Sequence, residues 1–204
     1  MKKPEIKAVL FDLGNVLLCF NALKAGKRFA KNCGVSLKAI WEHFFISPVE
    51  RAYTRGEVST REFYLHSCKA FKKKIPYADF CHYWNDIFWE NEGMEDLLKK
   101  LKKKYPLYLI SNTNALHFNH VKRKFTMLRH FKKTFPSHEM GHRKPDIAIY
   151  QKVLRRIKLP AEQTVFIDDV PAFVDGARKA GMHAIRFRNR KQLIRDLKKF
   201  GIKV

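Results

Sequence analysis

The feature that most constrains the fold is a series of short apolar segments separated by stretches with helical periodicity. Four of these segments are rich in β-branched and aromatic residues and predict buried strands: residues 6–11, 107–110, 164–167 and 183–187. Apolar stripes at helical spacing occur within residues 97–101, 149–157 and 173–177. Strands that alternate with helices predict an α/β fold, in which a parallel sheet has helices on both faces.

The chain between the first and second predicted strands is too long for a simple crossover. It carries helical stripes and many aromatic residues. We therefore predict a small α-helical cap at residues 20–92, inserted after the first strand. Residues 1–19 and 93–204 would form the core domain. Most of the aromatic side chains are expected in the cap's own core, and some are expected to face the site.

Polar residues cluster where the predicted strands end. Asp12 follows the first strand, Ser111-Asn112 the second and Asp168-Asp169 the third. In parallel sheets ligands bind beyond the carboxyl ends of the strands, so these residues are predicted to converge on one rim. Each signal also has an ordinary interpretation: a turn for Asp12, a plain loop for Ser111-Asn112 and an exposed acidic turn for the aspartate pair.

The order of four motifs resembles the haloacid dehalogenase-like superfamily. These are Phe11 to Val16 (FDLGNV), Ser111-Asn112, Arg143-Lys144-Pro145 and Asp168-Asp169. The chain is most similar to the phosphatase branch with a small helical cap, which includes sugar-phosphate phosphatases and the N-terminal phosphatase domain of soluble epoxide hydrolases. Arg55-Gly56-Glu57 also resembles that branch. The resemblance implies a Rossmann-like core.

The resemblance further implies a magnesium-dependent phosphatase that acts on a small phosphomonoester, such as a sugar phosphate. Asp12 would attack phosphorus and form an aspartyl-phosphate. Mg²⁺ would be held by carboxylate oxygens of Asp12 and Asp169 and by the backbone carbonyl of Gly14, with Asp168 as support.

The phosphoryl oxygens would be held by Ser111, by backbone N–H groups next to it at Asn112, and by Lys144. Lys144 would also balance the charge on Asp12. Taken alone, Lys144 is equally well interpreted as one solvated lysine in a chain rich in basic residues.

The sequence departs from the superfamily pattern at two positions. Gly14 stands where most of these phosphatases carry a second aspartate, which acts as general acid and base. Phe173, four residues after Asp169, stands where Asn or Asp usually supports the metal site. Both changes suggest reduced catalytic efficiency.

A net charge of +23, from 42 basic and 19 acidic residues, leaves an alternative open. The same fold could bind a polyanion such as nucleic acid without efficient catalysis. The basic residues come in short runs that we place on exposed helix faces, among them Lys132-Lys133, and no nucleic-acid motif accompanies them.

No apolar stretch is long enough for a membrane span, and the start, Met1 to Glu5, is too charged for a secretory signal. We therefore expect a cytoplasmic protein whose four cysteines are reduced. His117 and His120 are expected to be packing or surface histidines rather than metal ligands. Arg55, Trp84 and Asn114 are candidate substrate contacts by position, and the oligomeric state is left open.

Overall fold

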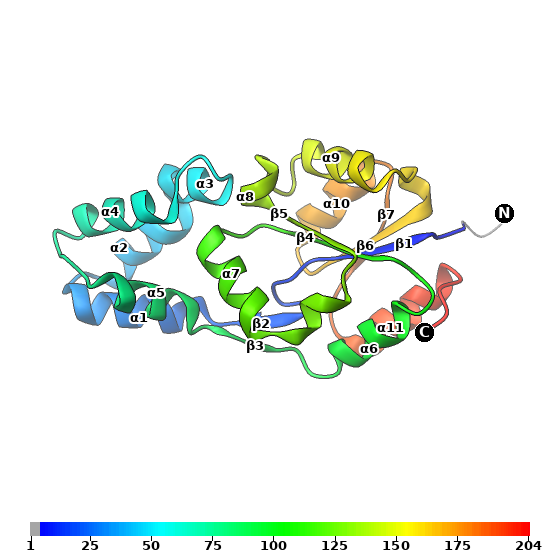
Figure 1. Cartoon of the computed structure of the whole chain (residues 1–204), viewed down its shortest axis with the longest axis horizontal. Coiled ribbons are helices and arrows are strands. Elements are labelled where there is room, and N and C mark those ends of the chain that lie inside the picture. The colour runs from blue at the N-terminus through cyan, green and yellow to red at the C-terminus, as the bar shows by residue number, and fades with distance from the viewer. Residues whose placement is uncertain (1–4) are drawn as a thin grey trace.

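The computed structural model describes residues 5–204, and a five-stranded parallel sheet lies at its centre (Figure 1). Across the sheet the strands follow the order β5 (Lys133–Pro136), β4 (Leu107–Ser111), β1 (Ala8–Phe11), β6 (Thr164–Asp168) and β7 (His183–Arg186). The predicted parallel sheet is confirmed. The first residues of the expected signal-free start, Met1 to Pro4, lie outside the described part of the chain.

The central strand β1 shows why these segments are apolar throughout. Val9 and Phe11 pack into the core on one face of the sheet, whereas Ala8 and Leu10 pack into the core on the other. All four are completely buried. A strand buried on both faces needs apolar residues at every position, since successive side chains point to opposite faces.

Helices cover both faces, as predicted (Figure 1). One face carries α6 (Met94–Leu101), α7 (Ala115–Lys124), the short 3₁₀ helix η2 (Thr126–His130) and α11 (Arg190–Lys199). The opposite face carries α8 (Ser137–Met140), α9 (Ile147–Ile157) and α10 (Pro171–Lys179), with the short 3₁₀ helix η3 (Ala161–Gln163) leading into β6. None of the helices within residues 5–204 is both long and apolar enough to cross a membrane.

The placement of Lys132-Lys133 on a helix face is wrong. Lys133 begins β5, which pairs with β4 at the edge of the sheet. A short edge strand tolerates lysine and even Pro136, because one of its sides makes no ladder hydrogen bonds. Because of these residues, the segment lacks the apolar pattern that predicts a buried strand, and the strand was not predicted from the sequence.

Between β1 and α6 the chain forms a separate helical layer, drawn in blue to cyan-green at one end of the molecule in Figure 1. It contains α1 (Ala22–Cys33), α2 (Leu37–Trp41), the π-helical turn η1 (Glu42–Ile46), α3 (Pro48–Thr54), α4 (Thr60–Ala70) and α5 (Tyr77–Asn85). Hereafter we call these helices the cap. Ser47 and Ser59 cap the N-termini of α3 and α4 with their side chains.

The cap has its own aromatic core, in which Phe29, Phe44, Phe63 and Phe80 are almost completely buried. The chain enters the cap through β2 (Leu18–Phe20) and leaves through β3 (Phe88–Glu90), and these two strands pair antiparallel. The domain boundaries at residues 20 and 92 stay a prediction.

Candidate active site

The central strands of the sheet bring the polar residues together. Asp12 follows β1 directly, Ser111 ends β4 and Asp168 ends β6, and β1 lies between the other two. Asp12, Asp168 and Asp169 each offer an oxygen within 4.8 Å of the others. The convergence at the rim therefore arises from the sheet order and from the position at which each strand ends.

A buried lysine neutralises part of this acidic cluster. Lys144 Nζ lies 2.7 Å from Asp12 Oδ1 and 2.5 Å from Asp168 Oδ2, and the lysine side chain is fully buried. Burial alone would lower the pKa of Lys144, but the carboxylates of Asp12 and Asp168 outweigh that effect and raise it. Lys144 is therefore a fixed cation between two carboxylates, not a solvated lysine.

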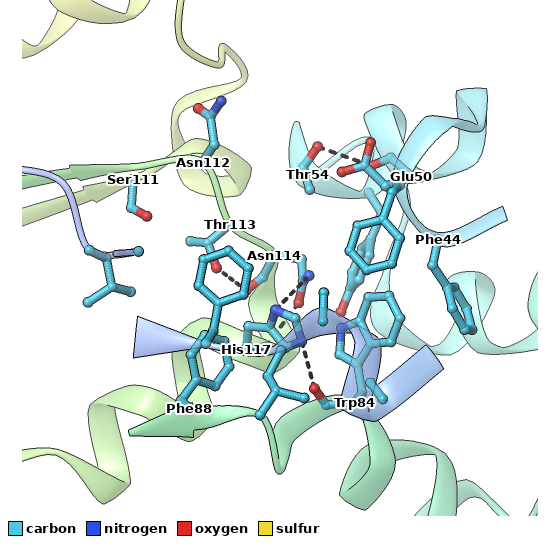
Figure 2. A pocket seen from close by; sticks show the side chains of 18 residues that line it. Phe44, Glu50, Thr54, Trp84, Phe88, Ser111, Asn112, Thr113, Asn114 and His117 are labelled. Carbon is cyan, nitrogen blue, oxygen red and sulfur yellow. Dashed lines mark hydrogen bonds between the residues drawn. The ribbon is translucent and has the colours of Figure 1, made fainter. Parts of the chain in front are cut away.

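Asn112 orients this lysine from the neighbouring strand end. Its amide nitrogen donates to the Lys144 carbonyl at 2.8 Å, and its amide oxygen accepts from the Lys144 backbone N–H at 2.8 Å. Figure 2 shows the Asn112 amide directed away from the His117 side of the pocket. Both ends of the Asn112 side-chain amide therefore bond to the backbone of Lys144.

Phe173 also contacts Lys144. Its ring centroid lies 4.9 Å from Lys144 Nζ, and the Phe166 ring lies 5.3 Å away on β6. Aromatic faces attract a cation, with roughly 0.5–2 kcal/mol for such a contact depending on solvation. The aromatic ring thus supports the lysine at a position where the superfamily pattern has a polar residue.

The three carboxylates suit a divalent cation. Burial raises the pKa of Asp168 and of Asp169, and the neighbouring Asp12 adds to the effect on both. Asn15 Nδ2 donates to Asp169 Oδ2 at 3.3 Å and orients it. Hard oxygen donors that repel one another in a buried place fit Mg²⁺.

The turn after β1 also leaves the Gly14 carbonyl available. The Asn15 N–H donates to Leu18 O at 2.7 Å and the Leu18 N–H donates to Leu13 O at 2.9 Å. None of the described backbone hydrogen bonds in this turn uses the Gly14 oxygen. The carbonyl is therefore free to serve as a further hard ligand.

Ser111 lies at the core end of the cavity with a hydroxyl that is free among the described residues. It is 3% exposed and lines the cavity beside the acidic cluster. Its Oγ makes no hydrogen bond to another side chain or backbone group within residues 5–204. A nearly buried hydroxyl without a protein partner is ready to donate to a ligand oxygen.

An aromatic ring occupies the space in front of Gly14. A Cβ placed on Gly14 would come within 3.1 Å of the Phe20 ring and 3.9 Å of Asp12 Oδ2. Phe20 belongs to β2, which leads into the cap. The position where the superfamily pattern has a general acid is thus bordered by an apolar side chain.

A cavity of about 210 Å³ extends from this rim into the cap. Gly14, Ser111 and Asn112 line its core end, whereas Phe44, Phe45 and Trp84 line its cap end. Figure 2 shows Ser111 and Asn112 on one side of the pocket and Phe44 and Trp84 on the other. Two candidate substrate contacts, Trp84 and Asn114, line the cavity. The third, Arg55, is not among its lining residues and pairs with Glu57 at 2.7 Å.

His117 packs rather than binding a metal. It stacks on Trp84 and lies edge-on to Phe88, and its Nε2 bonds to the Trp84 carbonyl at 2.9 Å. Burial lowers the pKa of His117 to about 3, so the ring is neutral. His120 is also outside the metal-ligand cluster found in the described chain.

The cap is fixed to the core by polar contacts of α3. Ser137 Oγ contacts the Thr54 carbonyl at 2.6 Å, and Arg143 bonds to Thr54 Oγ1 at 2.9 Å and to Glu50 at 3.2 Å. Gly56 follows α3 with φ +76°, and any Cβ there would overlap the His138 carbonyl oxygen. This close approach explains why glycine follows Arg55.

Sequence reasoning missed the roles of Asn15, Phe20 and Arg143, and the ring contact of Phe173. Asn15 lies in the FDLGNV motif and Arg143 in the Arg143-Lys144-Pro145 motif, so the sequence indicated that both lie near the site. Phe20 was visible only as the last residue before the cap.

Comparison with known proteins finds the family that the motifs resemble. Residues 6–181 match the family model of haloacid dehalogenase-like hydrolases. The chain is 28% identical over 200 residues to a drimenol cyclase of Aspergillus calidoustus, covering 94% of this chain but only 36% of the cyclase. It is 26% identical over 181 residues to a sesquiterpene phosphatase of Aspergillus oryzae, covering 86% of this chain and 87% of that enzyme.

A solved structure shows the same architecture. It is a HAD family enzyme from Bacteroides thetaiotaomicron in complex with magnesium and inorganic phosphate. It superposes with a TM-score of 0.82 at 27% identity, over 90% of this chain and 95% of that one. With the family match over most of its length, this chain belongs to the haloacid dehalogenase-like hydrolases.

Proposed function

We propose that this hydrolase is a magnesium-dependent phosphatase that cleaves a small phosphomonoester through an aspartyl-phosphate on Asp12. The observation that carries the proposal is the acidic cluster with Lys144 inserted between Asp12 and Asp168. Phosphatase relatives support the reaction type, and the magnesium in a solved relative supports the metal. The four free cysteines fit the cytoplasmic location that we propose.

In this proposal the two oxygens of Asp12 have different tasks. Lys144 holds Oδ1, whereas Oδ2 lies 3.9 Å from the position that a Cβ on Gly14 would take. In the first step Oδ2 would attack phosphorus, and the bond from phosphorus to the ester oxygen would break. Because Gly14 supplies no acid, the leaving alkoxide would take its proton from water.

In the second step water would attack phosphorus, and the bond between phosphorus and Asp12 would break. The carboxylate is regenerated, inorganic phosphate is released and the proton of the water passes to solvent. Throughout, Ser111 Oγ and the Asn112 N–H would donate to phosphoryl oxygens, while Lys144 offsets negative charge.

Asp12, Asp169 and the Gly14 carbonyl would hold Mg²⁺, with Asp168 supporting the site. When bound, the ion supplies positive charge that lets two anionic groups approach each other. In this proposal Asn15 keeps Asp169 oriented through the hydrogen bond at 3.3 Å.

The test is release of phosphate from p-nitrophenyl phosphate, with and without Mg²⁺. Asp12→Asn should lower turnover by roughly 10³-fold or more, because the nucleophile is lost. Asp175→Asn is the matched control, since Asp175 is exposed on α10 and its ion pair is with the exposed Arg178. Turnover retained in Asp12→Asn would refute the mechanism.

A second candidate, polyanion binding, draws on the net charge of +23 and on a basic hollow beside α11. Arg178, Arg186, Arg188 and Arg195 line that hollow. Binding of a fluorescent single-stranded RNA that weakens steeply with salt, without turnover of any phosphomonoester, would favour this candidate. Absence of salt-sensitive binding would exclude it.

A further inference from the structure

The geometry points to a substrate whose organic body is apolar, about the size of one ring with short substituents, bound between the core and the cap. This inference rests on the phosphomonoesterase activity proposed above and specifies its substrate class. It replaces the sugar phosphate expected from resemblance with a phosphate ester of an apolar alcohol.

The wall of the cavity beyond the phosphate end is mainly apolar and aromatic. The side chains that form it come from β2, η1, α5 and β3 and the residue before β3: Phe20, Phe44, Phe45, Trp84, Ile87 and Phe88. These elements surround the space into which the body of a bound ester would extend from Ser111. Apolar walls of this kind favour an apolar ligand, because burying its surface releases water.

Several polar side chains on this wall are already hydrogen-bonded within the protein. Thr54 accepts from Arg143 at 2.9 Å and donates to the Glu50 carbonyl at 3.0 Å, and one oxygen of the Glu50 carboxylate pairs with Arg143 at 3.2 Å. They form one hydrogen-bonded set on α3 and the core.

Asn114 and His117 form a second closed set (Figure 2). Asn114 Oδ1 accepts from the His117 backbone N–H at 2.9 Å, and its amide nitrogen lies 3.5 Å from His117 Nδ1. The other ring nitrogen of His117 bonds to the Trp84 carbonyl. The Trp84 indole nitrogen is buried and its N–H lacks an acceptor in the described chain, so it is one polar group of this wall that is left without a hydrogen bond.

A sugar body would therefore lose hydrogen bonds on entry. Each of its hydroxyls exchanges water for a wall that has few free polar partners, and an unmade hydrogen bond costs roughly 1–3 kcal/mol. An apolar body pays no such penalty.

The apolar surface begins directly at the reacting centre. A Cβ placed on Gly14 would lie 3.1 Å from the Phe20 ring and 3.9 Å from Asp12 Oδ2, so the ring and the carboxylate border the same space. The carbon bonded to the leaving oxygen would therefore contact an aromatic ring.

The volume indicates how much of the body the cavity can enclose. An apolar protein cavity of roughly 150 Å³ accepts benzene. The cavity here, at about 210 Å³, accommodates one ring with a short extension.

Two phosphates of matched shape test the inference. Cyclohexylmethyl phosphate and glucose 6-phosphate both place a phosphate on a methylene attached to a six-membered ring, but only the latter carries hydroxyls. We expect kcat/KM to favour cyclohexylmethyl phosphate by roughly 100-fold or more, because several hydroxyls stay unpaired in the glucose ester. p-Nitrophenyl phosphate, measured in parallel with Asp12→Asn, reports whether the phosphatase itself works.

Phe45→Gln and Trp41→Gln form a matched pair of variants. The two rings stack with their centroids 4.4 Å apart, and both are partly exposed. Of the two, Phe45 lines the cavity and Trp41 does not. Phe45→Gln should lower the preference for the cyclohexyl ester by roughly tenfold, whereas Trp41→Gln should leave it within about twofold.

The outcomes are distinct. Preference for the cyclohexyl ester that falls only in Phe45→Gln supports the inference. Equal rates, or a preference for glucose 6-phosphate, in an enzyme that turns over p-nitrophenyl phosphate overturn the inference and leave the phosphatase proposal intact. No turnover of any of the three esters overturns both.

Discussion

The two ends of the cavity differ in whether their polar groups have hydrogen-bond partners within the protein. At the core end, the Ser111 hydroxyl has no hydrogen-bond partner among the described residues, and three carboxylates lie close together. At the cap end, the polar groups of Thr54 and His117 are bonded to neighbours within the protein. Unsatisfied groups indicate where a ligand completes the structure, whereas satisfied groups serve to hold the wall in shape.

The ends also differ in what stabilises them. The core end depends on a buried cation among carboxylates, which is stable only while its partners are present. The cap end depends on aromatic packing, such as the contact of Phe44 with Trp84 at 4.4 Å between ring centroids. The predictions below test this contrast, beginning with the largest effect.

Lys144→Met should break the core end. The change leaves Asp12 and Asp168 without their shared cation in a buried place, and we expect a loss of about 3–5 kcal/mol in the free energy of unfolding. Urea denaturation in the presence of a chelator measures it. Lys99→Met is the control: its two ion pairs on α6 are long and exposed, so the change should stay within about 0.5 kcal/mol. Equal losses would contradict the contrast.

Gly56→Ala should disturb the contact between the cap and the core. Its left-handed φ costs an L-residue roughly 1–2 kcal/mol. Relief of the overlap with the His138 carbonyl should add roughly 1–3 kcal/mol. Gly34→Ala separates these effects, because Gly34 has φ +68° but nothing within 4 Å of a Cβ. Thermal unfolding of both variants should show the larger loss at Gly56, and identical losses would argue against a tight cap contact.

His117→Gln should change how stability depends on pH. The pKa of His117 is lowered from 6.5 to about 3 in the folded chain, so the unfolded chain binds more protons between those values. The stability that depends on the neutral ring is thus complete above 6.5 and is lost as the pH falls toward 3. The wild type should lose up to roughly 1.4 kcal/mol per pH unit more than the variant over this range. If stability fell with pH equally in the wild type and the variant, the folded chain would not oppose protonation of His117.

Arg55→Ala should have the smallest effect. Arg55 bonds to Glu57 at the surface and is not among the residues that line the cavity. We expect almost no change in the free energy of unfolding and unchanged turnover of p-nitrophenyl phosphate, because exposed ion pairs contribute little. A marked rise in KM would place Arg55 in contact with substrate.

The sequence predicted the sheet and its rim because both depend on local signals. A run buried on both faces, such as residues 8–11, is apolar at each position, and Asp12 follows it immediately. The sequence could not show that the Asn112 side chain hydrogen-bonds to the backbone of Lys144, or that the Phe173 ring faces the Lys144 ammonium group. Those contacts join residues distant in the chain, and spacing carries no information about them. β5 was missed for the opposite reason: its composition is atypical of a strand because it lies at the edge.

The paired strands β2 and β3 have a consequence for how such a molecule can diversify. Phe20 and Phe88 lie opposite each other, so the chain leaves the core and returns to it at one point. The chain therefore connects the core to residues 21–87 at one point, as it would to a single turn, and the remaining contacts of the cap with the core are non-covalent. A helical layer attached in this way can be replaced by another of different sequence or length. Such a replacement would change which molecules reach Asp12 and leave the residues at the strand ends in place.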